Sequence, residues 1–164
     1  MTSAGDGANV YGIFITNLFG TGTITNSSVT NSQTNNLKIS NNAATPGTLT
    51  VGNSTFTTTD PVNGGDAVNI ETGVGGTQVG NLTLNLTGNN NLNSSQGDGL
   101  QAAANDNSTL RVSVNGTGSN YNGNHERSSV FTRTRYDLCA VRDVCYRRRK
   151  NCRTGEPSNQ ALSR

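Results

Sequence analysis

The chain has 164 residues, of which only 30% are hydrophobic, 5% aromatic and 13% charged, and it contains no tryptophan. Globular domains average about 45–50% apolar and about 25% charged residues, so this composition excludes a conventional domain with a thick core. The net charge of +2 hides a division: residues 1–124 carry two basic and six acidic residues, whereas residues 125–164 carry ten basic and four acidic ones. The charge therefore does not indicate a uniformly basic, nucleic-acid-binding protein.

Four segments along the chain repeat one pattern, beginning at Gly12, Leu37, Ala67 and Leu100. Each segment holds two runs with alternating apolar residues and then one apolar residue in a frame of Asn, Ser, Thr and Gly. A period of two places the apolar side chains on one face of a β-strand, so we predict three short strands in every segment. The side chains expected to point inward are Ile13, Ile15, Ile24 and Val29 in the first segment, Leu37, Ile39, Leu49, Val51 and Phe56 in the second, Val68, Ile70, Leu82, Leu84, Leu86 and Leu92 in the third, and Leu100, Ala102, Leu110, Val112, Val114 and Tyr121 in the fourth.

Repetition at roughly 20 to 35 residues is typical of a solenoid, in which each unit buries its apolar face only by stacking on its neighbours. Equivalent strands would pair in parallel about 4.8 Å apart, with like residues above one another. An alignment on the second run stacks Ile24, Leu49, Leu82 and Leu110, at spacings of 25, 33 and 28 residues. We expect the connecting loops to absorb these differences in length.

The predicted fold is all-β: a short right-handed parallel β-helix of about four coils over residues 1–124, followed by a basic, poorly structured tail over residues 125–164. Four coils would rise only about 19 Å. A partial extra coil before Gly12 is an alternative, because GDGANV at Gly5 matches GDAVNI at Gly65 and GDGLQA at Gly97. The many Asn residues suit the corners, since Asn tolerates the left-handed backbone region and its amide can bond both its own turn and the next coil.

The repeats over residues 5–124 resemble the right-handed parallel β-helix of bacterial surface proteins, particularly the passenger regions of autotransporters and large adhesins rich in Asn, Thr and Gly. More distantly, they resemble pectate-lyase-like enzymes. The first resemblance implies an extracellular or cell-surface structural module whose partner is carbohydrate or a host surface. The second implies, as the alternative, a polysaccharide-acting enzyme. We expect no cofactor in either case.

We expect this chain to be a fragment of a longer array, because about three stacked units are the minimum for a solenoid and no capping helix is visible before Gly5. Uncapped ends would favour self-association. The opening residues MTSAGDGANV lack the charged and apolar regions of a signal peptide, so secretion would require either a signal on a longer parent chain or an unconventional route. The sequence has no apolar stretch near the roughly 18 residues of a membrane-spanning helix.

Asp66 and Asp98 are the candidate catalytic or calcium-binding residues, since both follow a Gly at equivalent places in GDAVNI and GDGLQA. On adjacent coils they would stack about 5 Å apart, and Asp6 is a further candidate for the same column. Two stacked carboxylates could share a calcium ion or a proton. We favour the alternative in which each Asp caps its own turn. Lys38 and Arg111 lie on different coils and strands and offer no basic partner for catalysis.

Thr-x-Thr pairs at Thr23–Thr25 and Thr48–Thr50 resemble the flat faces of ice-binding β-solenoids, which gives a lesser alternative function. The later coils break the array, because the aligned positions are Thr83 with Asn81 or Asn85, and then Arg111 with Thr109 or Ser113. Thr is also favoured at any solvent-facing strand position, so the pairs alone do not indicate ice binding.

The last forty residues differ from the rest, with few Asn and Gly, many Arg and all three cysteines. The run Arg147–Lys150 could be a nucleic-acid or localisation patch, but such runs are usually solvated tails, so we expect no nucleic-acid partner. Cys139, Cys145 and Cys152 lack the spacing of zinc knuckles, so we expect no metal there. A further hypothesis is that a shifted reading frame replaced a fifth coil, which translation of the other frames beyond Asn124 would test.

Overall fold

The computed structural model describes residues 10–59, 65–75, 79–116, 120–122 and 129–132 of the chain. Within these ranges all the regular structure is β, with no helix. Branched and Thr side chains suit pleated strands, and Asn suits the corners between them, which accounts for this outcome. The strands are β1 (Ile13–Thr16), β2 (Gly20–Thr25), β3 (Ser28–Thr30), β4 (Leu37–Asn41), β5 (Gly47–Gly52), β6 (Thr55–Thr58), β7 (Val68–Thr72), β8 (Asn81–Thr87), β9 (Asn91–Ser94), β10 (Leu100–Ala104), β11 (Thr109–Asn115), β12 (Asn120–Asn122) and β13 (Ser129–Thr132).

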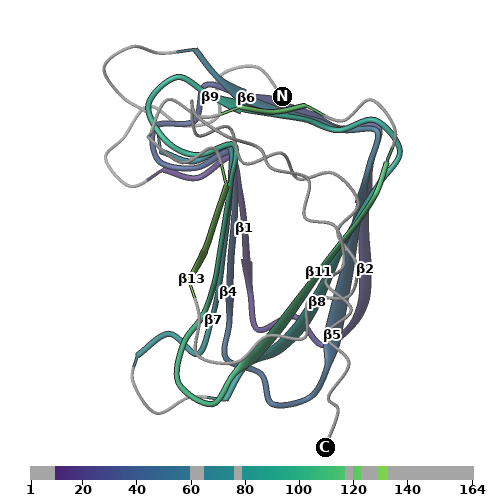
Figure 1. Cartoon of the computed structure of the whole chain (residues 1–164), viewed down its shortest axis with the longest axis vertical. Coiled ribbons are helices and arrows are strands. Elements are labelled where there is room, and N and C mark those ends of the chain that lie inside the picture. The colour runs from purple at the N-terminus through teal and green to yellow at the C-terminus, as the bar shows by residue number, and fades with distance from the viewer. Residues whose placement is uncertain (1–9, 60–64, 76–78, 117–119, 123–128, 133–164) are drawn as a thin grey trace, which may run out of the picture.

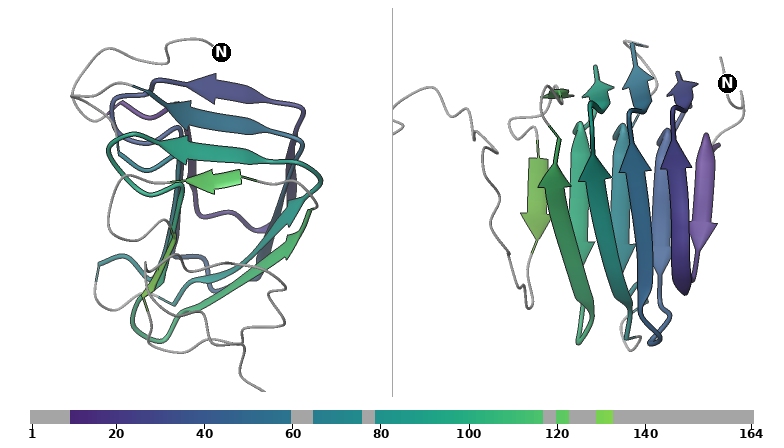
Figure 2. Two further views of the ribbon diagram at one scale, coloured as in Figure 1. Left: turned by 45° about the horizontal axis from the view of Figure 1, so that its top comes forward. Right: turned by 90° about the vertical axis from the view of Figure 1, so that its right-hand side faces the viewer.

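Every third strand along the chain belongs to the same sheet. The first sheet has the order β1-β4-β7-β10-β13, the second β2-β5-β8-β11 and the third β3-β6-β9-β12, and all neighbouring strands are parallel. Figure 1 shows the sheets as three sides around a common interior, and Figure 2 shows equivalent strands side by side along the stack. This arrangement is consistent with a parallel β-solenoid, as the repeats predict.

The predicted stacking of the first and third runs is confirmed. The first sheet aligns Ile13, Leu37, Val68 and Leu100 in one column and Ile15, Ile39, Ile70 and Ala102 in the next. The third sheet aligns Val29, Phe56, Leu92 and Tyr121. Like residues therefore lie above one another in these two sheets, as expected for coils that stack in register.

The predicted alignment of the second run is wrong by two residues in its first two intervals. The structure pairs Ile24 with Val51, not with Leu49. It pairs Leu49 with Leu84, not with Leu82. In both cases the observed partner lies two residues further along the chain than the predicted one. The third interval, which ends at Leu110, is confirmed. A shift of two residues leaves the same side chains facing inward, so the apolar alternation alone does not distinguish these registers.

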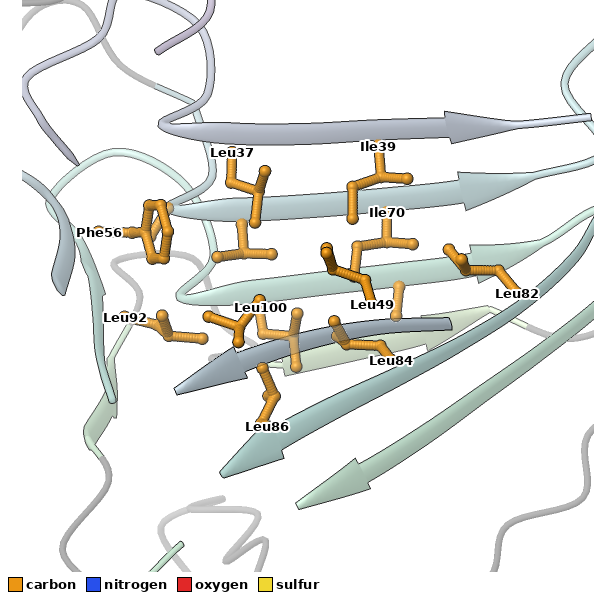
Figure 3. Close-up of a cluster of buried hydrophobic side chains, with 14 of the residues drawn as sticks. Leu37, Ile39, Leu49, Phe56, Ile70, Leu82, Leu84, Leu86, Leu92 and Leu100 are labelled. Atoms are coloured by element: carbon orange, nitrogen blue, oxygen red, sulfur yellow. The ribbon is translucent and has the colours of Figure 1, made fainter. Parts of the chain in front are cut away.

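The inward side chains of the three sheets form one buried cluster. Figure 3 shows this cluster, with Phe56 and Leu92 reaching in from the third sheet toward the side chains of the other two. The largest fully covered apolar side chains are Phe56, Leu37, Ile39, Leu49, Ile70, Leu82, Leu84, Leu86, Leu92, Val51 and Val68. Each coil adds only a few of them, so the stability of any coil depends on the neighbours stacked against it.

Asn residues occupy the corners with left-handed backbone, as predicted. The angle φ is 52° at Asn17, 57° at Asn31 and 49° at Asn53. The Oδ1 atom of each accepts a hydrogen bond of 3.0 Å from a backbone N–H of the next coil. The donors are the backbone amides of Asn42, Thr59 and Asn89 respectively. The corners therefore connect successive coils, as the strand ladders do.

We expect Asn53→Ala to lower the free energy of unfolding by about 2 to 3 kcal/mol. The lost bond to Asn89 accounts for about 1 kcal/mol, and the left-handed backbone costs about 1 to 2 kcal/mol in a residue that lacks the Asn amide. Asn53→Gly should cost less, because glycine accepts this backbone without strain. Urea denaturation followed by circular dichroism measures both variants, with the exposed Asn107→Ala as the control. Equal losses for Asn53→Ala and Asn53→Gly would contradict the role given to the left-handed corner.

The structure continues the first sheet beyond residue 124. Strand β13 pairs in parallel with β10, with Ser129 opposite Leu100. The basic run, the three cysteines and Asp6 lie outside the described residues. The sequence-based division of the chain at residue 124 therefore stays a prediction.

Candidate functional site

The outward face of the second sheet carries columns of threonine. Thr21 pairs with Thr48 and Thr48 with Thr83, while Thr23 pairs with Thr50 in the neighbouring column. Because parallel strands lie about 4.8 Å apart, each column repeats one hydroxyl group at that interval. The face therefore presents regularly spaced groups that can donate and accept hydrogen bonds.

The predicted Thr-x-Thr array is shifted by two residues, like the second run that carries it. The pair that aligns with Thr48–Thr50 is Thr21–Thr23, whereas the sequence alignment used Thr23–Thr25. Arg111 follows Thr83 in the first column, so the array is interrupted at the fourth strand, as the sequence indicates. Ice binding itself stays a prediction.

The outward face of the third sheet carries Thr and Asn in register. One column aligns Ser28, Thr55 and Asn91, and the other aligns Thr30, Thr57 and Asn93. These columns contain no charged residue, and the third sheet resembles the second in offering hydroxyl and amide groups. Two of the three lateral faces are thus polar and almost uncharged.

The outward face of the first sheet differs, because its side chains form a charged network. The Nζ atom of Lys38 lies 2.7 Å from Oε2 of Glu71 and donates a hydrogen bond of 2.5 Å to Oδ1 of Asn69. The amide Nδ2 of Asn69 donates to Oδ2 of Asp66 at 2.6 Å and also to Oε1 of Gln101. Since Lys38, Asn69 and Gln101 form one column, this network joins the strands β4, β7 and β10.

Asp66 and Asp98 lie at equivalent places before β7 and β10, but Asp66 does not cap the backbone of its own turn. Its Oδ1 atom accepts a hydrogen bond of 2.9 Å from the backbone N–H of Asp98, one coil further on. Its Oδ2 atom accepts bonds from Asn69 and, at 3.5 Å, from Asn35. Asp98 is only 2% exposed, and its carbonyl oxygen accepts a bond of 2.9 Å from the backbone N–H of Ala67. These contacts connect the two corners, and catalysis or calcium binding by the pair stays a prediction.

The sequence pattern does not identify Asn69, Glu71 and Gln101 as members of a polar network. Lys38 and Arg111 lie on different coils and strands, as predicted, but Asn69 joins Lys38 to Asp66 by bonding both. The alternation does predict that every member of the network except Asp66 points outward from its strand. This shared outward position is the one sign of the network in the sequence. The hydrogen bonds themselves depend on side-chain torsions that the alternation does not determine.

We expect Asp66→Ala to lower the free energy of unfolding by about 2 to 3 kcal/mol, because hydrogen bonds to a charged acceptor are worth about 1.5 to 3 kcal/mol. Glu71→Ala should cost about 1 kcal/mol or less, since the Glu71 side chain is 31% exposed and a partly solvated ion pair contributes little. Urea denaturation of the two variants gives the comparison. A greater loss for Glu71→Ala would contradict the structural role of Asp66.

No group of three or more His, Cys, Asp or Glu side chains within the described ranges could hold a metal ion. The same ranges contain no helix that is long and apolar enough to cross a membrane.

By its strand order and pairing, the chain is consistent with the class of parallel β-solenoid proteins. Comparison with known proteins found no matching family model, no similar curated protein and no similar solved structure.

Proposed function

We propose that this chain is a structural and adhesive module of an extracellular bacterial surface repeat protein, either an adhesin or a fragment of an autotransporter passenger region. The proposal includes right-handed winding, about four coils over residues 1–124 and a basic tail after them. The observation that carries it is the register of the Thr and Asn columns on the second and third sheets. Uncharged groups that recur about every 4.8 Å suit a ligand that itself repeats, such as a polysaccharide.

Binding by these faces is passive and multivalent. A single hydroxyl or amide gains only about 1 kcal/mol in net hydrogen-bond energy, because it exchanges a bond with water for one with the ligand. Several columns that engage one chain of sugars together raise the apparent affinity through effective concentration. Because the columns carry almost no charge, this binding should depend only weakly on salt.

Immobilised polysaccharides and a glycan array, probed with the purified chain, test the adhesive function. The double variant Thr48→Val with Thr83→Val removes two stacked hydroxyls from the second sheet and keeps the shape of the side chains. Its control is Thr16→Val, which makes the same exchange at an exposed position on the first sheet, outside the two proposed binding faces. We expect at least a fivefold loss of retention for the double variant. Failure of the unmodified chain to bind any glycan would contradict the proposal.

Polysaccharide cleavage is the second candidate, and one observation favours it: Lys38 is joined through Asn69 to Asp66 on the same face of the molecule. A cation beside a carboxylate is a common arrangement for acid–base chemistry. Against it, both carboxylate oxygens of Asp66 already accept hydrogen bonds, and Asp98 is buried.

The two functions separate in one assay. The chain is incubated with neutral and acidic polysaccharides, with and without calcium, and soluble oligosaccharides are measured over time. An enzyme releases them, and Asp98→Ala abolishes the release. An adhesive module retains the polysaccharide without release, and its retention survives the same substitution.

A further inference from the structure

Three left-handed corners of the stack carry an Asn followed by a Ser, and they begin at Asn26, Asn31 and Asn53. In such a pair the backbone nitrogen of the Ser is the group that can attack the side-chain amide of the Asn. In each pair this backbone N–H instead donates a hydrogen bond to a side-chain oxygen. The bonds run from Ser27 to Oγ of Ser54 (3.2 Å), from Ser32 to Oδ1 of Asn36 (3.1 Å) and from Ser54 to Oδ1 of Asn90 (3.0 Å). The folded corners therefore restrain the nitrogen that this reaction requires.

Asn115, the last residue of β11, is followed by Gly116 and not by a Ser. Its side chain is exposed on the outward face of the second sheet, where Asn115 pairs with Thr87. Its Nδ2 atom donates a hydrogen bond of 2.8 Å to Oγ of Ser113 on the same strand. A glycine has no Cβ atom to hinder its backbone nitrogen, and it adopts a wide range of backbone angles. Asn115 therefore combines an accessible amide with the least hindered backbone nitrogen that a neighbouring residue can supply.

We propose that Asn115 is a modification site at which the chain deamidates spontaneously, with water as the co-reactant. The backbone nitrogen of Gly116 loses its proton and attacks Cγ of Asn115. The new N–Cγ bond closes a succinimide ring, the Cγ–Nδ2 bond breaks, and Nδ2 leaves as ammonia with the proton that the nitrogen gave up. Water then opens the ring at one of its two carbonyl carbons. Opening at Cγ gives an aspartate, and opening at the backbone carbon gives an isoaspartate.

The modification changes the charge of the second sheet. Either product adds a carboxylate to an outward face whose columns are otherwise almost uncharged. The isoaspartate also inserts an extra carbon into the backbone at the corner after β11. The reaction needs only the Asn-Gly pair and water, so it does not rest on the proposed adhesive function. Because the Gly116 nitrogen must lose its proton before it attacks, the rate should rise with pH.

Peptide mapping by mass spectrometry tests the proposal on the full chain, incubated in native buffer at neutral and at mildly alkaline pH. Fragment ions assign each product to its residue, and chromatography separates aspartate from isoaspartate. We expect Asn115 to convert at least about tenfold faster than Asn31 or Asn53, because the Gly nitrogen is unhindered. Gly116→Ala should slow the conversion at Asn115 at least about fivefold, since it adds a Cβ atom beside the attacking nitrogen. The control is Asn107→Ala, at another exposed Asn, which should leave the rate at Asn115 unchanged.

Unfolding in urea releases the Ser nitrogens, so the conversion at Asn31 and Asn53 should accelerate there. Circular dichroism shows whether Gly116→Ala remains folded, and if it does not, Asn115→Gln takes its place, because the longer side chain closes a ring much less readily. The proposal is overturned if Asn31 or Asn53 converts as fast as Asn115 in native buffer, or if urea leaves their rates unchanged. A product at Asn115 without isoaspartate also overturns it, since direct hydrolysis of the amide gives aspartate alone. So does a rate that neither Gly116→Ala nor Asn115→Gln lowers.

Discussion

Phe56→Ala is expected to lower the free energy of unfolding by about 3 to 5 kcal/mol, the usual cost of removing a fully buried aromatic side chain. Phe56 is 0% exposed and lies between Val29 and Leu92 in the inward column of the third sheet. The total stability of a domain is about 5 to 15 kcal/mol, so this single cavity removes a large share of it. Urea denaturation followed by circular dichroism measures the loss.

The matched control for Phe56→Ala is Phe19→Ala, because it deletes the same group from a side chain that is 72% exposed. We expect a change within about 0.5 kcal/mol. The comparison is made at a concentration low enough to keep the chain monomeric. Similar losses for the two variants would show that Phe56 does not lie in the core of the stack.

Gly73→Ala is expected to cost about 2 to 5 kcal/mol. The backbone at Gly73 is left-handed, with φ at 71°, which costs a residue with a Cβ atom about 1 to 2 kcal/mol. A Cβ atom there would also lie 2.4 Å from the backbone oxygen of Asn105, on the next coil. Relief of this overlap requires backbone movement, and overpacking of that kind costs about 1 to 3 kcal/mol more.

Gly20→Ala separates the two contributions at Gly73. The angle φ at Gly20 is 72°, almost the same, but a Cβ atom there would meet nothing within 4 Å. We therefore expect Gly20→Ala to cost only about 1 to 2 kcal/mol in the same denaturation experiment. If the two substitutions cost the same, the close approach of the corners at Gly73 and Asn105 is not present in solution.

The sequence was sufficient to predict which of the described apolar side chains point inward and the registers of two of the three sheets. In the third sheet, each coil has a single apolar residue in a polar frame, such as Val29 or Phe56, so only one alignment is possible. In the first sheet, pairs such as Leu37 with Ile39 recur with the same length and spacing. The register of the third sheet is therefore unambiguous, and so is that of the first sheet from Leu37 onward, because the apolar signal is short and bounded by polar residues. The first coil allowed an alternative, because GDGANV at Gly5 matches the later coils as well.

The second sheet could not be aligned from its apolar residues, because glycine occupies two of its inward register positions. The structure places Gly22 opposite Leu49 and Gly47 opposite Leu82. A glycine carries no hydrophobic signal, so the apolar alternation in β5 begins two residues after the first inward position of that strand, and in β2 it begins two residues after Gly22. Leu82 is followed on β8 by Leu84 and Leu86, which also point inward. Leu49 can therefore be aligned with any of these three leucines, in registers that differ by two residues.

The charged network could be predicted only as a set of positions. The alternation correctly places Lys38 and Asn69 in one outward column. It does not reveal that Asn69 bonds both Lys38 and Asp66, because that depends on side-chain torsions and on the path of the corner before β7. The hydrogen bond that the backbone N–H of Asp98 donates to Oδ1 of Asp66 cannot be predicted from the alternation for the same reason.

The most direct test of the stacked, parallel arrangement is an interstrand NOE measurement on the isotopically labelled chain, made between β5 and β8. This pair is decisive because the sequence and the structure disagree about its register. The structure requires backbone amide-to-Hα contacts that align Leu49 with Leu84. Contacts that align Leu49 with Leu82, or that run antiparallel, would contradict the arrangement of the coils.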